Sequence, residues 1–133
     1  MTDKDLWIKA DEIANNSYSP YSRFRVGAVL VTTKGIYVGT NVENRSFGLT
    51  ICAERTAITQ AITQGDLNWK ALYLTCIDAE EPVPPCGACR QVISEFTKHD
   101  FPVFYKDGNN NIVETTIAEL YPQDSLHNLH KHF

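Results

Sequence analysis

Three cysteines and one glutamate have the types and spacing to do chemistry. Cys52 stands two residues before Glu54, and a later C-x-x-C pair supplies Cys86 and Cys89. Thiolates are soft ligands that suit Zn²⁺; a structural zinc usually has four protein ligands, whereas a catalytic zinc has three and keeps one position open to water. A carboxylate beside that water can carry its protons. The set therefore predicts hydrolytic zinc chemistry, with the three cysteines as metal ligands and Glu54 as the acid–base group.

Two other uses of these cysteines, as a redox pair or as a structural zinc site, fit the sequence less well. A C-x-x-C pair alone also fits a redox pair or half of a structural zinc site. A redox pair has no need of a third cysteine beside a carboxylate. A fourth structural ligand would have to come from Cys76 or from the histidines of the tail, which lack the spacing; Cys76 lies in an apolar run and is interpreted as a small core residue. The tail histidines are interpreted as solvated polar residues, with a weak metal patch as the alternative. They are His127, His130 and His132.

Length and composition indicate one domain over residues 1–133, with 43% apolar and 21% charged residues. No apolar run approaches the roughly 20 residues that span a bilayer. The polar N-terminus has no apolar signal-peptide core, so we expect a cytoplasmic protein with reduced thiols and no membrane partner. The net charge of −4 and the scattered basic residues disfavour a nucleic-acid surface and favour a small neutral substrate.

Hydrophobic periodicity and turn residues predict an α/β fold of three α/β/α layers, with helices on the faces of a mixed five-stranded sheet. Thr50 is the expected N-cap of the second helix and Gly65 its stop. Both cysteine segments then fall at helix N-termini, which stabilise thiolates. The expected helices are residues 3–16, 50–64, 86–98 and 117–121, and the expected strands are 26–32, 36–41, 71–77, 103–105 and 112–115.

Five blocks, in order along nearly the whole chain, resemble the cytidine deaminase family of the short, homotetrameric kind. They are SPYSRFRVGA (19–28), NVEN (41–44), FGL (47–49), CAERTA (52–57) and PCGACRQ (85–91). The cysteine–glutamate pattern is that of the zinc nucleobase deaminases, with cysteine in place of the first histidine. The resemblance implies a cytidine deaminase-like fold, one Zn²⁺ per chain on the three cysteines, and proton transfer by Glu54 during attack on C4 of cytosine.

The resemblance also assigns residues around this centre. Arg55 would hydrogen bond to a cysteine sulfur and offset the net negative charge of three thiolates and one Zn²⁺. Asn41 and Glu43, two residues apart on a strand and so on one face, would bind the ribose. Phe24 would pack on the pyrimidine, and Phe47 would reach a neighbouring subunit of a homotetramer. An Ala- and Ile-rich face over residues 53–62 that could pack against copies of itself is the physical support for that assembly.

The C-terminal segment departs from the family pattern. Leu120-Tyr121-Pro122 resembles the family's Leu-Leu-Pro, but the aromatic that commonly follows is replaced by Ser125. Leu126 and Phe133 are the two residues that could fill the space. The implied function is hydrolytic deamination of cytidine and 2′-deoxycytidine in pyrimidine salvage. The alternatives are a blasticidin S-type deaminase and a zinc-stabilised binding module without turnover.

Overall fold

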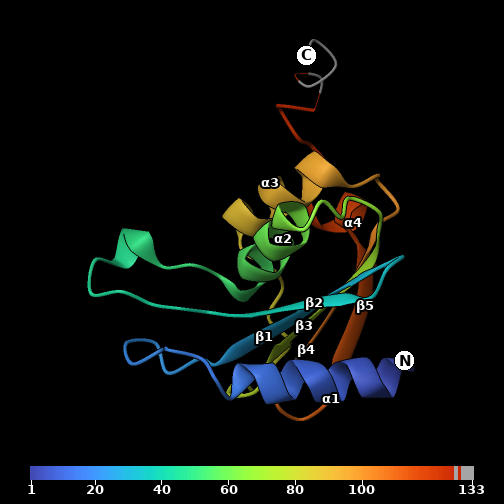
Figure 1. Ribbon diagram of the computed structural model, residues 1–133. Coiled ribbons are helices and arrows are strands. Elements are labelled where there is room, and N and C mark those ends of the chain that lie inside the picture. Colours follow the sequence, from blue (N-terminus) through green and yellow to red (C-terminus); the bar gives the residue numbers. More distant parts are fainter. Residues whose placement is uncertain (128, 130–133) are drawn as a thin grey trace.

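The computed structural model describes residues 1–127 and 129, and its centre is a five-stranded sheet in the order β2-β1-β3-β4-β5 (Figure 1). Only β3 and β4 run parallel, and the other neighbours are antiparallel. The predicted mixed sheet is therefore confirmed. The strands are β1 (Val26–Thr32), β2 (Ile36–Thr40), β3 (Trp69–Cys76), β4 (Pro102–Lys106) and β5 (Ile112–Thr116).

Helices cover both faces of this sheet and give the three expected layers. Helix α1 (Asp3–Ala14) lies on one face, while α2 (Ala53–Thr63), α3 (Gly87–Phe96) and the short α4 (Ile117–Leu120) lie on the other (Figure 1). Helix α3 is the crossover between the parallel strands β3 and β4. Within the part of the chain that the structure describes, no helix is long and apolar enough to cross a membrane.

Helix α1 begins with a capping box and is held by its apolar side. The Thr2 hydroxyl accepts a hydrogen bond from the Asp5 N–H at 3.2 Å, and the Asp5 carboxylate accepts one from the Thr2 N–H at 3.0 Å. Its buried face, which includes Leu6, Trp7 and Ala10, packs on the sheet. This is the amphipathic helix that the sequence predicts, ending two residues earlier than expected.

The predicted N-cap of the second helix is wrong by two residues, since the observed N-cap is Cys52 and not Thr50. Thr50 closes a short 3₁₀ turn, η1 (Phe47–Leu49), by donating its N–H to the Phe47 carbonyl at 3.1 Å. Ile51 then exchanges backbone hydrogen bonds with Val42, both at 2.9 Å. Because this pairing keeps the backbone extended, α2 cannot begin before Cys52, which becomes its N-cap. The predicted stop is confirmed, since Gly65 follows the helix with a φ of 75° that favours glycine.

The apolar side of α2 packs mainly against the sheet of its own chain. Ala53, Ala57, Ile58 and Ala61 are buried and pack with Leu30 and other residues of the sheet in one core cluster. These four side chains are therefore not available to another copy, because packing against the sheet already removes them from water. That α2 packs against copies of itself stays a prediction, which would have to use its half-buried and exposed residues, such as Ile62.

Gly39 allows α2 to lie close against β2. A Cβ atom built on Gly39 would stand 2.5 Å from the Ala53 carbonyl oxygen and 2.7 Å from the Ala57 nitrogen, both in the first turns of α2. Backbone atoms cannot move away as the end of a long side chain can. Glycine is thus required where the strand supports the start of the helix that carries Cys52.

We expect Gly39→Ala to lower the free energy of unfolding by about 1–3 kcal/mol, because the added methyl group overpacks a rigid contact. Urea unfolding followed by circular dichroism measures this change. Gly48→Ala is the matched control, since its Cβ would meet nothing within 4 Å. Equal stability of the two variants would contradict the close approach described above.

Candidate metal centre and substrate pocket

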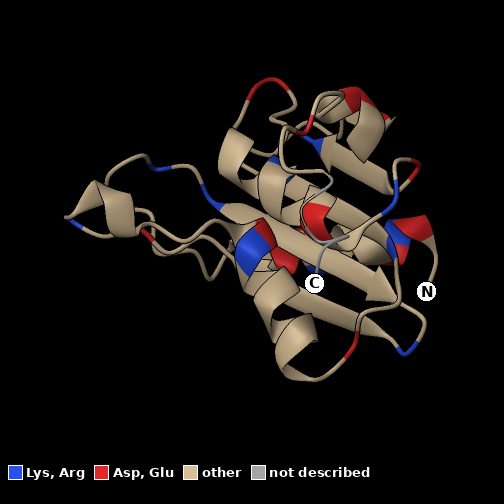
Figure 2. Cartoon of the chain, turned by 90° about the horizontal axis from the view of Figure 1, so that it is seen from above, with Lys and Arg blue, Asp and Glu red and all other residues tan. Residues whose placement is uncertain are grey.

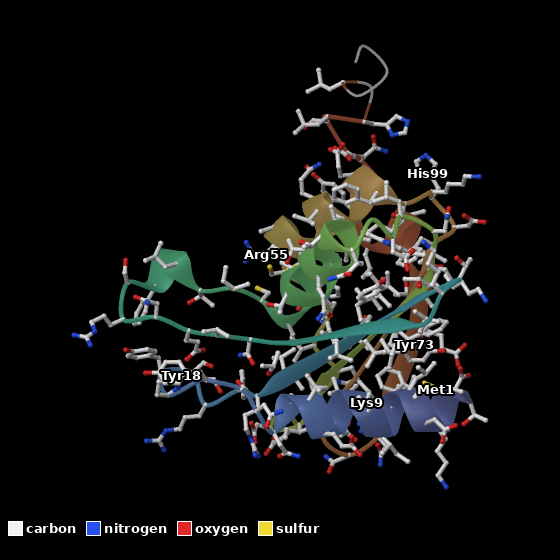
Figure 3. The ribbon with its side chains drawn as sticks, viewed as in Figure 1. Met1, Lys9, Tyr18, Arg55, Tyr73 and His99 are labelled. Atoms are coloured by element: carbon white, nitrogen blue, oxygen red, sulfur yellow. The ribbon has the colours of Figure 1, made fainter. Side chains whose placement is uncertain are left out.

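The three predicted metal ligands come together at the starts of two helices. Cys52 and Cys86 are the N-caps of α2 and α3, and Cys89 lies in the first turn of α3. Their sulfur atoms all lie within 4.8 Å of one another, and those of Cys52 and Cys86 are 3.8 Å apart. Figure 3 shows sulfur atoms beside Arg55 at this end of α2. Two segments distant in sequence thus form one cluster.

The sulfur cluster fits Zn²⁺ by geometry and by donor type. Two thiolates bound at about 2.3 Å from a tetrahedral zinc lie about 3.8 Å apart. The Cys52–Cys86 sulfur distance of 3.8 Å equals that value. Among the residues that the structure describes, the cluster contains no fourth Cys, His, Asp or Glu ligand. Three sulfurs without a fourth protein ligand match the pattern of a catalytic zinc site rather than a structural one.

The cysteine thiols differ in how readily they ionise. A hydrogen bond from the Cys89 thiol, together with one from Arg55, lowers the pKa of Cys52 to about 5 despite its partial burial. The same contact with Cys52, together with burial, raises the pKa of Cys89 above its usual range. Cys52 is therefore the first thiolate of the metal-free chain. A bound metal must drive the release of the Cys89 proton, so metal affinity will depend on pH.

Arg55 places positive charge beside the sulfurs. Its Nη2 atom donates to the Cys52 sulfur at 3.4 Å. Its Nε atom is buried and has no hydrogen-bond partner within the described residues. A buried guanidinium is costly without counter-charge. Three thiolates around one Zn²⁺ supply such a charge, so this unpaired donor also fits an anionic metal cluster.

Glu54 is buried in the first turn of α2, with only 4% of its surface exposed. Burial disfavours the carboxylate and raises the pKa of Glu54 to about 7, and the negative charge on Cys52 acts in the same direction. A carboxyl group with a pKa near neutrality can both accept and return a proton during turnover. The structure thus places the predicted acid–base residue next to the predicted metal ligands, with a pKa that lets it exchange protons near neutral pH.

Asn41 does not occupy the strand position that the sequence analysis expects. Strand β2 ends at Thr40, and residues 41–43 are linked to their neighbours by isolated bridges through Val42. The Asn41 side chain accepts hydrogen bonds from the Ser17 hydroxyl at 2.6 Å and the Val26 N–H at 3.0 Å. It donates one to the Phe24 carbonyl at 2.8 Å. Most of its polar capacity therefore holds the 17–26 segment, leaving one amide N–H.

Glu43 is tied to the same segment. One of its carboxylate oxygens accepts the N–H groups of Tyr21 at 3.0 Å and Ser22 at 3.2 Å. Burial opposes ionisation, but the hydrogen bonds from Ser22 and Tyr21 outweigh it and hold the pKa of Glu43 below its usual value. The second oxygen has no hydrogen-bond partner within the described residues. Glu43 is thus an ionised group with one oxygen available to a ligand.

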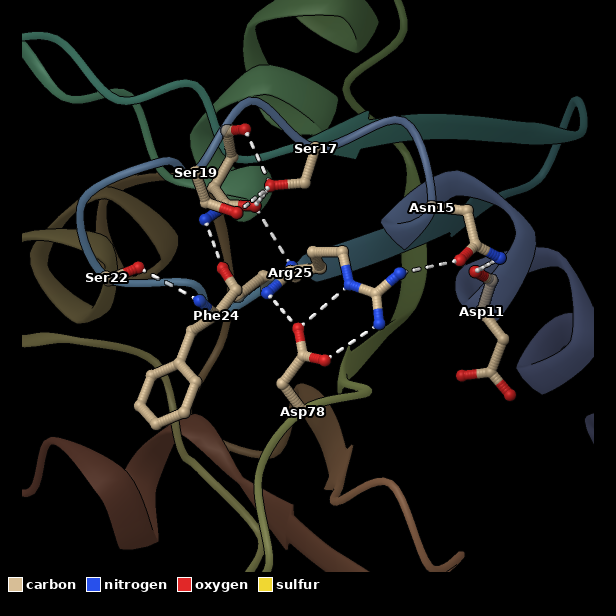
Figure 4. A network of polar contacts seen from close by, with 10 residues as sticks. Asp11, Asn15, Ser17, Ser19, Ser22, Phe24, Arg25 and Asp78 are labelled. Carbon is tan, nitrogen blue, oxygen red and sulfur yellow. Dashed lines mark hydrogen bonds and ion pairs between the residues drawn. The ribbon is translucent and has the colours of Figure 1, made fainter.

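A second polar network fixes the loop that carries Phe24 (Figure 4). The Asp78 carboxylate accepts hydrogen bonds from the Arg25 backbone N–H and Nε at 2.9 Å each and from its Nη2 at 2.8 Å. Arg25 also donates from Nη1 to the Asn15 side chain at 3.2 Å. Asp78 follows β3 and Asn15 follows α1, so the loop is held by both. Such bidentate pairs are geometrically specific.

The two predicted aromatic contacts are exposed in one chain. Phe47 is 71% exposed and packs edge-on against Tyr21, with ring centroids 5.5 Å apart; Phe24 is 48% exposed. Phe47 and Glu43 line one cavity of about 290 Å³ with Tyr21, Ser22 and Thr50. Phe24 and the cysteines do not line it. A single chain therefore presents two parts of a site, the metal cluster and this cavity, without enclosing them.

Arg90 is a supporting residue that the sequence analysis does not single out. Its Nε donates to the Pro85 carbonyl and its Nη1 to the Leu120 carbonyl, each at 2.7 Å. These bonds connect the segment before Cys86 to the end of α4. Its position directly after Cys89 could have indicated this supporting role, because a cation there can reach the backbone of its own loop.

The C-terminal segment brings no aromatic side chain from its described residues to the metal cluster. Ser125 lies in an exposed turn, and Leu126 is 49% exposed. Phe133, the other residue considered for that role, lies outside the described residues, as do His130 and His132. The Tyr121 hydroxyl donates to the Gln91 side chain at 2.6 Å, which ties the chain after α4 to α3. Cys76 is buried apart from the cluster, as predicted.

Comparison with known proteins agrees with this geometry. Residues 1–105 match the family model described as the cytidine and deoxycytidylate deaminase zinc-binding region. The chain is 44% identical over 123 residues to a cytidine deaminase of Sporosarcina psychrophila, covering 92% of this chain and 90% of that one. A crystal structure of cytidine deaminase from Burkholderia pseudomallei superposes with a TM-score of 0.87 at 38% identity, covering 92% and 98%. A blasticidin-S deaminase of Bacillus cereus is 31% identical over 109 residues, or 76% of each chain.

In the metal-free protein, Glu54→Gln should change how stability depends on pH. The pKa of Glu54 is raised from 4.5 to about 7 on folding, so the folded chain holds this proton more tightly. The resulting stability is complete below pH 4.5 and is lost as pH rises through 7; the shift corresponds to about 3 kcal/mol. Glutamine has no proton to lose, so the variant should gain that amount over wild type between pH 4.5 and 8.

Urea unfolding in the presence of a chelator, repeated across this pH range, measures the difference. Glu95→Gln is the control, because Glu95 is exposed on α3 and its removal should leave the pH dependence as in wild type. A stability difference between Glu54→Gln and wild type that is constant with pH would show that Glu54 ionises normally.

Proposed function

The chain belongs to the cytidine and deoxycytidylate deaminase family, and we propose that it deaminates cytidine and 2′-deoxycytidine to uridine and 2′-deoxyuridine. The reaction adds water at C4 of the cytosine ring and releases ammonia. The observation that carries the proposal is the buried Glu54 beside three sulfur ligands, Cys52, Cys86 and Cys89, that leave no fourth protein ligand in the described chain.

The residues of this chain supply most of the proposed mechanism. Cys52, Cys86 and Cys89 would hold one Zn²⁺, which when bound makes a water acidic enough to act as a nucleophile near neutral pH. Glu54 would accept the proton released by the attacking water, place it on the ring nitrogen N3, and pass a proton to the departing amine. One carboxyl group can perform these transfers because its pKa of about 7 makes both protonation states accessible.

Arg55 would tune the charge of the centre. Three thiolates and one Zn²⁺ carry a formal charge of −1, which weakens the metal as a Lewis acid. The hydrogen bond from Arg55 to the Cys52 sulfur withdraws electron density from that ligand. Its position is fixed independently of substrate, because Nη2 also donates to the Thr50 carbonyl at 3.5 Å.

The polar residues before α2 would bind the nucleoside. The available oxygen of Glu43 can accept a ribose hydroxyl, and the remaining amide N–H of Asn41 can donate to another. Phe24, on the loop held by Arg25 and Asp78, would pack against the pyrimidine ring. This arrangement favours a ribonucleoside or deoxyribonucleoside over a free base, which has no hydroxyl for Glu43 to bind.

Three other functions are weaker alternatives: deamination of an antibiotic, action on a polynucleotide, and binding without turnover. The similarity to a blasticidin-S deaminase supports deamination of a cytosine-containing antibiotic, but identity to that protein is 31%, against 44% for a cytidine deaminase. Lys and Arg occur at separate places along the chain (Figure 2), which favours a small substrate over a polynucleotide. A binding module without turnover leaves the raised pKa of Glu54 unexplained.

We propose a homotetramer as the working form, located in the cytoplasm and serving pyrimidine salvage. The segment from Val42 to Ile51 projects from the body of the chain (Figure 1) and exposes Phe47 and Leu49 to water. Exposed apolar side chains gathered on one segment are typical of contacts between chains. A neighbouring copy placed against them would also cover the open cavity beside Glu43. The free thiols of the described chain suit the reducing cytoplasm.

Zinc-loaded protein mixed with cytidine should lose the cytosine absorbance and release one ammonia per cytidine consumed. Glu54→Gln should keep one zinc per chain, because glutamine matches glutamate in shape and Glu54 is not among the metal ligands. Its turnover should fall by at least about 10²-fold, the usual contribution of acid–base catalysis. Absorbance, ammonia release and metal analysis on the same samples measure all three quantities.

Glu95→Gln serves as the matched control and should turn over cytidine at the wild-type rate. If zinc-loaded wild type left both cytidine and 2′-deoxycytidine unchanged, the proposed reaction would be wrong. Blasticidin S tested in parallel identifies the antibiotic alternative, and inertness towards all three compounds identifies the binding module.

Phe47→Ser should reduce the size of the assembly in solution. Wild type should sediment as four chains of 15.0 kDa each, whereas the variant should shift towards smaller species because it removes the aromatic side chain that is most exposed among the described residues. Analytical ultracentrifugation over a range of protein concentrations measures the change. Leu67→Ser is the control, since Leu67 is 59% exposed outside the 42–51 segment. A tetramer that survives Phe47→Ser unchanged, or a monomeric wild type, would contradict the proposed assembly.

A further inference from the structure

The four histidines of the chain belong to two short segments, and one histidine from each, His99 and His127, are in contact. His99 follows α3, and the others lie among the last seven residues. The imidazole rings of His99 and His127 are in contact, with centroids 5.3 Å apart and planes tilted by 38° (His99 is labelled in Figure 3). This pair lies beyond the C-terminal end of α3, whereas Cys86 and Cys89 lie at its N-terminal end. It is therefore separate from the sulfur cluster.

The separation of the two rings suits a shared metal ion. An imidazole nitrogen bound at about 2.0–2.1 Å places its ring centroid about 3.2 Å from the metal, so two imidazoles at a tetrahedral angle have centroids about 5 Å apart. The observed 5.3 Å agrees with that separation. Two protonated imidazoles at this distance would repel each other. A divalent ion instead binds the neutral form of each imidazole, so coordination to one ion holds the two rings together.

The segment that carries His127 is held in place by α3. The Asp124 carboxylate accepts hydrogen bonds from the Ser94 hydroxyl at 2.7 Å and from the Gln91 side chain at 3.3 Å, both on α3. The backbone N–H of His127 donates to the Asp124 carbonyl at 3.2 Å. The approach of His127 to His99 is thus supported by contacts that do not involve either ring. Both rings are exposed to solvent and accessible to an ion.

We propose that His99 and His127 form a second metal site, selective for divalent transition ions that prefer imidazole, such as Ni²⁺, Cu²⁺ or Zn²⁺. The bound ion joins the C-terminal segment to the loop between α3 and β4. This proposal concerns binding alone and does not depend on the deaminase reaction.

Isothermal titration of Ni²⁺ into zinc-loaded protein tests the site. We expect one Ni²⁺ per chain in addition to the zinc. His99→Asn and His127→Asn should each weaken binding by at least about tenfold, because loss of even an outer partner of a ligand costs 10–100-fold. Gln123 lines one cavity with His99 and His127. Gln123→Ala changes this cavity without removing an imidazole, so this variant should bind Ni²⁺ as wild type does.

Zinc measured on the same samples shows whether nickel has replaced zinc at the cysteines. The proposal is overturned if nickel only exchanges with zinc, or if no additional ion binds. It is also overturned if His99→Asn binds Ni²⁺ with wild-type affinity while His130→Asn does not, since the tail alone would then hold the ion. Weaker binding in both His99→Asn and His127→Asn, with an unchanged zinc content, supports the shared site.

Discussion

The meeting of two helix N-termini on one face of the sheet is the constraint on which the rest of the site depends. Cys52 and Cys86 are N-caps, and the distance of 3.8 Å between their sulfurs brings like charges together once both ionise. Helix dipoles and the Arg55 guanidinium offset part of that repulsion, and a bound cation offsets the rest. Gly39 contributes from outside the cluster, because it lets β2 support the first turns of α2.

The same arrangement explains why Glu54 is both buried and titratable near neutrality. Its place two residues after Cys52 puts it in the first turn of α2, on the side that faces the core. Burial and the charge on Cys52 raise its pKa, whereas a hydrogen bond from its own backbone N–H and smaller contributions from Cys89 and Arg55 lower it; the resulting pKa of about 7 reflects this balance. A carboxyl group on an exposed helix start would have neither effect. The packing that positions the three cysteines therefore also produces the raised pKa of Glu54, the proposed proton-transfer group.

The sequence is most informative where local pattern and tertiary contacts agree. Apolar and β-branched runs bounded by turn residues identify all five strands, and the C-x-x-C pair with Cys52-x-Glu54 identifies a cluster that the structure brings together. It is less informative between β2 and α2. Pairing of Ile51 with Val42 moves the helix start from Thr50 to Cys52, and this contact depends on the fold rather than on residues near Thr50. The ion pair between Arg25 and Asp78 likewise cannot be predicted from the sequence, because the two residues are far apart along the chain.

The proposed substrate-binding residues are positioned differently from the three cysteines. The cysteines are fixed by two helices packed on a hydrophobic core, whereas Phe24, Asn41 and Glu43 are fixed by polar contacts between irregular segments. Side-chain hydrogen bonds individually contribute about 1 kcal/mol, so these segments depend on many such contacts acting together. Asn41 shows the consequence. Its side-chain amide already accepts two hydrogen bonds and donates one, so only one N–H remains to donate to a ligand. Under the proposed function, specificity for the sugar would depend mainly on Glu43, whose carboxylate already accepts hydrogen bonds from two backbone N–H groups before any ligand binds.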